Sequence, residues 1–199
     1  MKKDAAKAKR SASATRDAIL TSARRAFAEK GYDGAGVREI AAGAGVTAML
    51  VNRYFGSKEK LFAEVVALTM ASPTILTREN LASADLARTM AKALVSITRG
   101  EDTPLDGFLI MFHSSSSKRA AEIGREQIEA GHHKTMKNAL TGNLVPERAA
   151  LILSIVAGFQ VMRQMMGLSA LTEADPEDLV DLIAPLLRML IDGAAQAEV

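Results

Sequence analysis

Apolar residues recur every three or four positions along almost the whole chain, and this spacing restricts the fold more than any other feature. It places apolar side chains on one face of an α-helix, whereas a half-buried strand would alternate apolar and polar residues. The sequence contains no such alternating stretch and no internal repeat. Its 199 residues are enough to bury a sizeable core. We therefore predict an all-α protein with about nine helices.

Capping residues and helix breakers indicate where these helices begin and end. Thr15 can cap the first helix, Gly31 suits the position after its last turn, and Pro73 should end the fourth helix. Asp175-Pro176-Glu177-Asp178 combines a capping Asp, a Pro at the first helical position and acidic residues in the first turn. The expected helices lie at about 15–31, 37–42, 47–54, 58–71, 85–99, 104–113, 118–140, 146–166 and from 176 onward.

Charge is distributed unevenly along the chain. Residues 1–62 hold 13 Lys and Arg against 6 Asp and Glu, whereas residues 63–199 hold 12 against 17. The basic part begins with a Lys-, Ala- and Ser-rich segment over 1–14, which we expect to be a flexible arm. This distribution indicates that the first part meets a polyanion, and the arm could then reach phosphates. Solubility charge and a solvated tail remain the alternatives.

The segment from Val37 to Tyr54 has the layout of a helix-turn-helix. Two short helices are separated by a turn that contains Gly43 and Gly45. Val51 and Phe55 are four residues apart, so they share one face of the second helix and can anchor it to the core. The outward face then presents Thr47, Ala48, Met49, Asn52 and Arg53. In DNA-reading motifs of this kind the second helix enters the major groove.

The residues around this motif resemble the TetR family of bacterial transcriptional regulators. The likeness rests on Ala18-Ile19-Leu20, Ala26–Tyr32, Val37–Ala41, Ala44-Gly45-Val46 and Tyr54–Phe62, and it spans some forty-five residues. The resemblance implies a three-helix DNA-binding domain over 15–62 and a fourth, linking helix to about residue 71. It further implies a C-terminal helical domain for ligand binding and dimerisation over 72–199.

Three departures from the family pattern concern DNA recognition. Gly36 stands where members usually have a Ser or Thr that caps the second helix, although Gly is tolerated there. Leu50-Val51-Asn52 replaces the commoner small-Leu-Tyr run, and Met49 is large where many members have a small residue. The base preference of better-known members therefore does not carry over to this chain.

We expect eight residues to contact DNA: Arg38, Thr47, Ala48, Met49, Asn52, Arg53, Tyr54 and Lys58. Asn52 could pair bidentately with adenine, and Ala48 and Met49 can touch thymine methyl groups. Lys58 can bind a phosphate with help from the exposed N–H groups of the fourth helix. Arg38, Thr47 and Tyr54 suit phosphates or groove edges. Arg53 could reach the DNA backbone or simply face solvent.

One such unit reads few base pairs, so a homodimer on a palindromic operator is expected, with half-sites roughly 34–36 Å apart. Ala149–Met162 is apolar nearly all round, and the last helix carries a second apolar stripe. The expected interface residues are Ile152, Ile155, Leu179, Leu182, Ile183, Leu186, Leu187 and Leu190. The alternative is that both stripes fill the core of one subunit.

The resemblance also implies an effector pocket among the middle helices. Candidate lining residues are Phe108, Met111, Phe112, Phe159, Met162 and Met166. Adaptable methionines and aromatic rings suit a small hydrophobic or planar effector, although the same residues could be ordinary core. Gln160, Arg163 and Gln164 could orient a polar group or face water.

Several functional classes lack support in the sequence. Zero cysteines exclude disulfides and thiolate metal sites, and the three histidines lack companions that would complete a metal site. We find no nucleophile–base constellation, no cofactor motif and no uninterrupted apolar run of eighteen residues. The expectation is a cytoplasmic, non-enzymatic DNA-binding regulator, a repressor released by a small effector. An effector-independent DNA-binding factor of this fold, an activator and, remotely, a helical enzyme remain alternatives.

Overall fold

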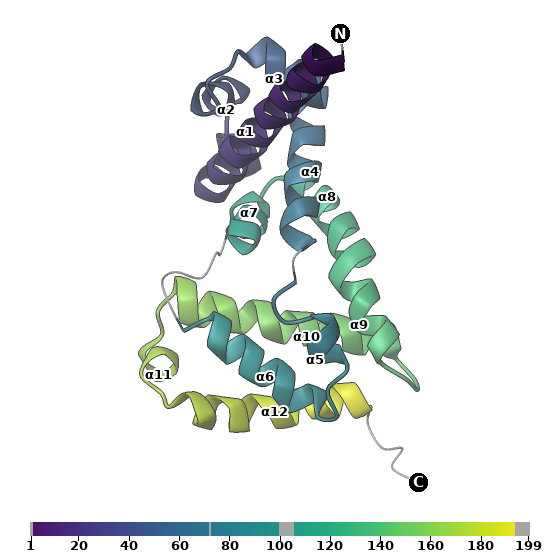
Figure 1. Cartoon of the computed structure of the whole chain (residues 1–199). Helices are drawn as coiled ribbons and strands as arrows, with labels where there is room; N and C mark the ends of the chain where they lie inside the picture. Colours follow the sequence, from purple (N-terminus) through teal and green to yellow (C-terminus); the bar gives the residue numbers. More distant parts are fainter. Residues whose placement is uncertain (1, 72, 100–105, 194–199) are drawn as a thin grey trace. The chain divides into compact units, whose positions relative to one another are not determined.

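The computed structural model describes the backbone of residues 2–71, 73–99 and 106–193, with side chains from residue 12 onward. Within these ranges every regular element is a helix and none is a strand, which confirms the all-α prediction (Figure 1). All nine expected helices occur there. Two helices of four residues were not expected, α5 (Arg78–Leu81) and α11 (Ser169–Thr172).

The chain divides into two compact units. The first comprises Met1–Ala71 and Pro104–Gln127, and the second comprises Ser72–Thr103 and Ile128–Val199. Packing thus groups residues 106–127 with the expected DNA-binding domain, although they follow the expected boundary at residue 72 along the chain. The reason is that Ile110 lies fully buried in the same core cluster as the helices of the first domain.

The first unit contains α1 (Lys2–Gly34), α2 (Val37–Gly43), α3 (Ala48–Phe55), α4 (Lys58–Met70), α7 (Asp106–Ser114) and most of α8 (Lys118–Ile128). Its core joins α1, α2, α3 and α4 through large side chains that are almost entirely buried. These include Ile19, Phe27, Ile40, Val51, Leu61 and Phe62. Phe27 and Phe62 meet edge to face with their ring centroids 5.0 Å apart. This core holds the two short helices of the motif in place.

Helix α1 differs from expectation at its beginning. It starts at Lys2 rather than after Thr15, so Thr15 is an interior helical residue and does not cap the helix. The physical reason is composition, because the segment is rich in Ala and Lys, which favour helices, and contains no Gly or Pro. The side chains of the basic arm over 1–11 lie outside the described residues. At the other end Gly31 has φ +67°, which breaks the helical geometry where the sequence predicted the last turn to end.

The second unit contains α5, α6 (Leu86–Ile97), α9 (Lys134–Ala139), α10 (Val145–Gln160), α11 and α12 (Pro176–Asp192). Two π-helical turns, Glu129–His133 and Val161–Met165, precede α9 and follow α10. Helices α6 and α12 lie side by side along much of their length (Figure 1). Leu94 of α6 and Leu187 of α12 are fully buried in their common core.

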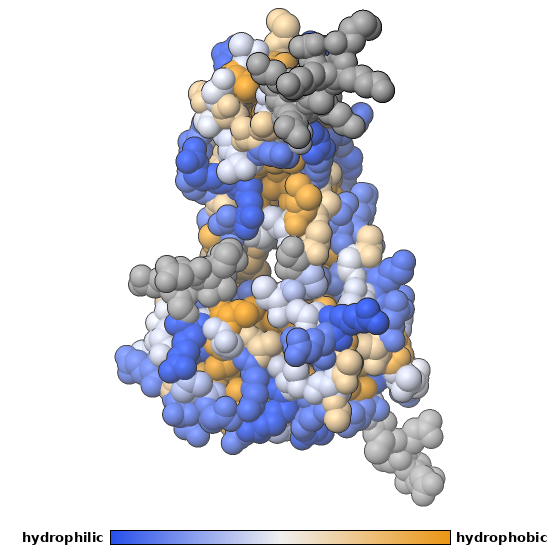
Figure 2. Space-filling view, viewed as in Figure 1, coloured by the Kyte–Doolittle hydropathy of each residue, from blue (hydrophilic) through white to orange (hydrophobic). Residues whose placement is uncertain are grey.

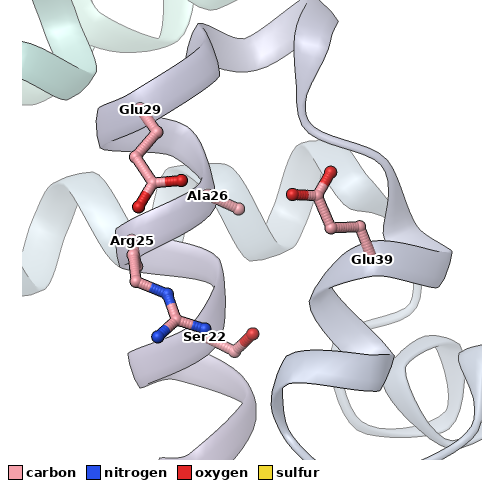
Figure 3. Close-up of a pocket in the computed structure, with 5 residues that line it drawn as sticks. All are labelled: Ser22, Arg25, Ala26, Glu29 and Glu39. Carbon is pink, nitrogen blue, oxygen red and sulfur yellow. The ribbon is translucent and has the colours of Figure 1, made fainter.

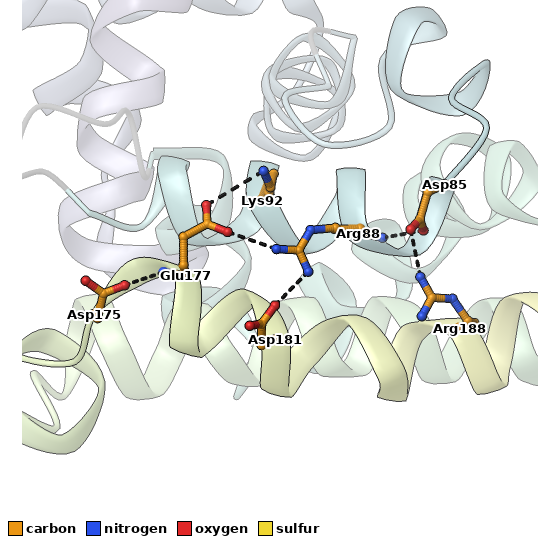
Figure 4. A network of polar contacts seen from close by, with 7 residues as sticks. All are labelled: Asp85, Arg88, Lys92, Asp175, Glu177, Asp181 and Arg188. Carbon is orange, nitrogen blue, oxygen red and sulfur yellow. Dashed lines mark hydrogen bonds and ion pairs between the residues drawn. The ribbon is translucent and has the colours of Figure 1, made fainter.

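A network of charged side chains lines the outside of this α6–α12 contact (Figure 4). Arg88 donates to Asp181 at 2.6 Å and to Glu177 at 2.9 Å, which joins the two helices. Asp85 caps α6 through the backbone N–H of Arg88 and accepts from Arg188 at 2.7 Å. These pairs are exposed, so each adds little to stability, and the apolar contact beneath them holds the helices together.

Helix α10 is the most apolar helix of the second unit. With the π turn it spans Val145–Met165, which by length and composition alone could cross a membrane, and 17% of that apolar window is buried. Arg148 and Arg163 on this segment are nevertheless buried and hydrogen bonded to neighbouring parts of the same unit. Arg148 donates to backbone carbonyls of Thr141, Asn143, Leu190 and Ile191. One face of α10 is thus docked on the unit, and much of the rest is uncovered.

Candidate nucleic-acid interface

Local capping positions the helices of the motif. Gly36 occupies the N-cap of α2 with φ −91° and offers no side-chain cap, as the sequence predicted. The hydroxyl of Thr47 caps α3 by accepting from the N–H of Leu50 at 3.3 Å, and Ser57 caps α4 through the N–H of Lys60. The Thr47 hydroxyl is thus engaged with its own helix in the free protein. Its expected DNA contact would add to this bond or replace it.

The packing of α2 on α1 requires a small residue at the turn. A Cβ atom at Gly43 would lie 2.4 Å from the hydroxyl oxygen of Ser22. That hydroxyl is buried and donates to the carbonyl of Ile40 at 2.8 Å. A larger side chain at Gly43 would therefore require the Ser22 hydroxyl to move and give up its bond to Ile40, or α2 to shift on α1.

Helix α3 is anchored by the two residues that the sequence assigned to this role. Val51 is 1% exposed and Phe55 is 6% exposed. The guanidinium of Arg16 lies 5.1 Å from the centroid of the Phe55 ring and forms an ion pair with Glu64 of α4. Arg16 therefore links α1, α3 and α4. Sequence reasoning missed this residue, because its partner Glu64 is 48 positions away and no local pattern connects them.

The other face of α3 is open to solvent. Met49 is 82% exposed, and Asn52 and Arg53 are exposed beside it. Arg38 on α2 is also exposed, and within the described residues neither it nor Arg53 has an acidic partner within 4.0 Å. These residues form a polar and basic surface with one protruding apolar side chain.

Two of the expected contact residues, Ala48 and Tyr54, are only partly accessible. Ala48 and Tyr54 are half-buried and pack against the core of the first unit. Ala48, which we expected on the outward face, is thus partly covered by the rest of the unit. The cause is its place in the first turn of α3, which lies close to the rest of the unit. Both residues keep an accessible part that a DNA strand could touch.

Lys58 begins α4 and lies folded back onto the end of α1. Its ammonium is 4.7 Å from the centroid of the Tyr32 ring and donates to the carbonyl of Asp33 at 3.4 Å. Partial burial lowers the pKa of Lys58, while the charge of Asp33 opposes that shift. To bind a phosphate, Lys58 would give up its contacts with Tyr32 and Asp33 for a charge-assisted hydrogen bond to the phosphate, which is stronger.

Two of the hollows on the described surface of the first unit have a volume of about 240 Å³ each. One lies between α1 and α2, where Figure 3 shows the side chains of Arg25, Glu29 and Glu39 around it. The other is lined mainly by residues of α1 and α4. None of the six expected effector-pocket residues lines either hollow. Phe108, Met111 and Phe112 belong to the first unit, whereas Phe159, Met162 and Met166 belong to the second.

The expected dimer residues fall into different environments. Four of them are buried in the core of the second unit itself: Ile152, Leu179, Ile183 and Leu187. For these four residues the burial agrees with the alternative that both stripes fill one subunit's core. Ile155 and Leu190 are half-buried, whereas Leu182 and Leu186 are 69% and 52% exposed. Figure 2 shows apolar side chains reaching the surface over the helices of this unit.

Family models match both parts of the chain. Residues 19–65 match the model described as bacterial regulatory proteins of the tetR family. Residues 84–191 match the model described as the tetracyclin repressor-like C-terminal domain, which alone covers more than half of the chain. The first match spans α2, α3 and parts of α1 and α4, which form the surface described above.

One characterised relative and many solved structures are similar to this chain. The HTH-type transcriptional repressor AcnR of Corynebacterium efficiens is 48% identical over 48 residues, which span 24% of this chain and 26% of the relative. A TetR-family regulator from Streptomyces coelicolor aligns over 90% of this chain and 95% of its own, with a TM-score of 0.58 and 23% identity. The regulator FadR of Bacillus subtilis, solved with stearoyl-CoA, aligns over 90% of this chain and 100% of its own, with a TM-score of 0.61 and 19% identity. The structural likenesses show the fold, and the family models show that the chain belongs to the TetR family of bacterial regulatory proteins.

Proposed function

We propose that this protein is a transcriptional regulator that binds DNA through α3. The observation that carries the proposal is the solvent-exposed face of this helix. Val51 and Phe55 fix α3 to the core, while Met49, Asn52 and Arg53 project away from it. A helix this short gains little from packing on one side alone, so the exposed face makes sense as the surface that enters a major groove.

The side chains divide the expected contacts into two kinds. Asn52 has the donor and acceptor needed for the edge of adenine, and Met49 offers an apolar surface for a thymine methyl group. Arg38 and Lys58 carry charge, and they would position the motif on phosphates without reading sequence. Affinity for DNA of any sequence should therefore depend on Arg38 and Lys58, whereas the preference for particular bases should depend on Asn52 and Met49.

Fluorescence anisotropy with DNA from the region upstream of the protein's own gene tests this division. We expect the double variant Arg38→Ala, Lys58→Ala to bind more weakly. Each lost phosphate contact removes about 0.9 from the slope of log K against log salt. A dimer on its operator loses two such contacts in each subunit, so the double variant should lose roughly 3.6 from this slope. Lys134→Ala is a matched control, because Lys134 is exposed and lies in the second unit. Unchanged affinity and slope in the double variant would contradict the assignment.

We further propose that the regulator is a cytoplasmic repressor that a small effector releases from a palindromic operator. The characterised relative AcnR is named a repressor, and the structural neighbour FadR was solved with stearoyl-CoA. An effector would act by stabilising a conformation that binds DNA poorly, which requires different affinities for the two conformations. The test is transcription from the upstream promoter in vitro. Added regulator should lower it, and a rise would identify an activator.

Homodimerisation is the last part of the proposal, and it is supported by the uncovered surface of α10 and α12. Leu151 on α10 is 52% exposed, and Leu182, Leu186 and Met189 on α12 are 52–69% exposed. Large apolar patches of this kind mark interfaces. A second copy would cover them with the same two helices, which gives an intermolecular four-helix bundle. The buried Ile152, Leu179, Ile183 and Leu187 would support this surface from below.

A further inference from the structure

The orientation of α3 depends on how its last turn is held on the rest of the first unit. Val51 and Phe55 bury one face of the helix, and Phe55 is its last residue. Gly56, with φ +80°, and Ser57, the N-cap of α4, follow directly. This two-residue connection keeps the end of α3 close to the start of α4. It leaves the angle between the two helices to the side chains that pack around Phe55.

Arg16 is the charged side chain that contacts Phe55. It belongs to α1, and its guanidinium carbon lies over the Phe55 ring, 5.1 Å from the centroid. Its Nη2 donates to Oε1 of Glu64 on α4, with which it forms an ion pair. A planar guanidinium can lie over a ring and bind a carboxylate through its edge at the same time. Arg16 therefore fixes the end of α3 relative to both α1 and α4.

Helix α1 contacts the two helices of the motif through different polar side chains. The buried hydroxyl of Ser22 donates to the carbonyl of Ile40 in α2 at 2.8 Å. Arg16 instead contacts Phe55 at the end of α3. Loss of the Arg16 contact should therefore act on α3, the helix that carries Asn52, and leave the Ser22 contact of α2 in place.

A small tilt of α3 about Phe55 is enough to displace the side chains that would read bases. The helix has eight residues, Ala48–Phe55. Its length is thus about 12 Å, and a tilt of about 10° would displace its first turn by about 2 Å and Asn52 by about 1 Å. Hydrogen bonds form over a range of only about 0.5 Å between donor and acceptor. Attraction between a charged side chain and a phosphate falls off more gradually with distance. A tilt would therefore weaken base recognition more than it weakens phosphate binding.

We propose that Arg16 is a positioning residue for base recognition. Through Phe55 and Glu64 it fixes the angle at which α3 enters the major groove, and it reads no base itself. The inference rests on the proposed function of DNA recognition through α3, and it adds a residue outside this helix that determines sequence specificity. Loss of the contact should lower the preference for a particular sequence and leave the general attraction to DNA in place.

Fluorescence anisotropy with two duplexes tests this role on the full-length protein. One duplex comes from the region upstream of the protein's own gene, and the other is a shuffled duplex of the same length and composition. In Arg16→Met, the affinity for the upstream duplex should fall roughly tenfold or more, a loss comparable to that of one or two base contacts. The affinity for the shuffled duplex and its dependence on salt should change no more than in a control that removes a similar arginine.

Arg24→Met is this matched control. Arg24 lies on the same helix, its side chain is 44% exposed against 40% for Arg16, and it forms an ion pair with Asp106 of α7 at 3.0 Å. Its substitution removes the same charge and a similar pair, so the preference for the upstream duplex should stay at the wild-type value. Arg16→Lys keeps the charge that Glu64 binds but not the planar group over Phe55, and it should restore only part of the preference.

Glu64 supplies a second variant for the case that Arg16→Met does not fold. Glu64→Gln keeps the size of the side chain and removes its charge, and it should lower the preference for the upstream duplex severalfold. In the double variant Arg16→Met, Glu64→Gln the preference should be no lower than in Arg16→Met alone, because the two side chains act through one contact. Additive losses would overturn the proposal.

Two further results of the anisotropy experiment would overturn the proposal. The first is an unchanged preference in Arg16→Met. The second is an equal loss on both duplexes together with a salt slope that is smaller by about 1.8, which corresponds to one lost phosphate contact in each subunit of a dimer. That result would show that Arg16 binds DNA directly.

Amide hydrogen exchange without DNA separates this proposal from the function on which it rests. The amides of α3 should exchange several times faster in Arg16→Met than in the wild-type protein, while those of α12 in the second unit should not change. Equal exchange of α3 in both proteins overturns the role of Arg16. If the wild-type protein does not prefer the upstream duplex, the proposed function fails on its own, and the exchange of α3 then decides the role of Arg16.

Discussion

A Cβ atom at Gly31 would lie 2.3 Å from the carbonyl oxygen of His113. The end of α1 therefore touches the backbone of α7 at a distance that only glycine permits. Neighbouring polar contacts support this approach, since His113 Nδ1 lies 2.6 Å from the carbonyl of Ala28 and the N–H of Tyr32 donates to Ser114. Gly31 also has φ +67°, in the left-handed region that other residues avoid. Two independent constraints thus fix the residue.

Gly31→Ala should therefore lower the free energy of unfolding by about 2–4 kcal/mol, from the left-handed backbone and the steric overlap together. Urea unfolding followed by circular dichroism measures the change. Gly131→Ala is the control, because a Cβ atom there meets nothing within 4 Å and its φ is not positive. The free energy of unfolding of this control should be unchanged or slightly higher than that of the wild type. A neutral Gly31→Ala would show that α7 does not pack as described.

Arg148 should be far more important for stability than an exposed arginine on the same unit. Arg148→Met leaves several carbonyls at the end of α12 and before α10 without a donor, which should cost about 3–5 kcal/mol. Arg188→Met removes one exposed ion pair with Asp85 and should change little. The loss of stability in each variant is measured by thermal unfolding, relative to the wild-type protein. Equal effects would contradict the role of Arg148 as the donor that satisfies these carbonyls.

The cap of α6 predicts a pH dependence. The N–H of Arg88 and then the side chain of Arg188 lower the pKa of Asp85 from its usual 3.8. Because the folded state prefers the ionised carboxylate, this stabilisation is present above the unfolded pKa and is lost as pH falls through the folded value. The urea midpoint of Asp85→Asn should thus be lower than that of the wild type at pH 7. Below pH 3.8 the two midpoints should converge. A constant difference across this range would refute the assignment.

Two equally exposed leucines provide a matched test of the dimer. Leu186 on α12 and Leu68 on α4 are both 52% exposed. Leu186→Glu places a charge in the proposed interface and should convert the dimer to a folded monomer at micromolar concentration. Leu68→Glu should leave the dimer intact. Light scattering on a size-exclusion column distinguishes these results, and a wild-type protein that is already monomeric would contradict the dimer.

The features that sequence reasoning predicted correctly are mostly local. The glycine cap of α2, the Ser57 start of α4 and the Asp175 start of α12 depend on residues a few positions apart. The anchoring of α3 by Val51 and Phe55 follows from helical spacing in the same way. Such features need no knowledge of the rest of the fold.

The features that it missed depend on partners far along the chain. Arg16 contacts Phe55 and Glu64, and Arg163 bonds to Val95, 68 positions away. Sequence spacing also could not divide the stripe of α12 into its two faces, because leucines that point to α6 and leucines that point outward alternate within a few residues. Which face is buried depends on where α6 lies. The DNA contacts themselves stay predictions.

Selection from a random pool of double-stranded DNA by the purified protein tests the central claim most directly. Sequencing of the enriched pool should show a two-fold symmetric motif with half-site centres about one helical turn or slightly more apart. The variant Asn52→Ala should relax the preference at one position of each half-site, since it removes the side chain suited to adenine. A pool that gains no symmetric motif from the wild-type protein would contradict the account.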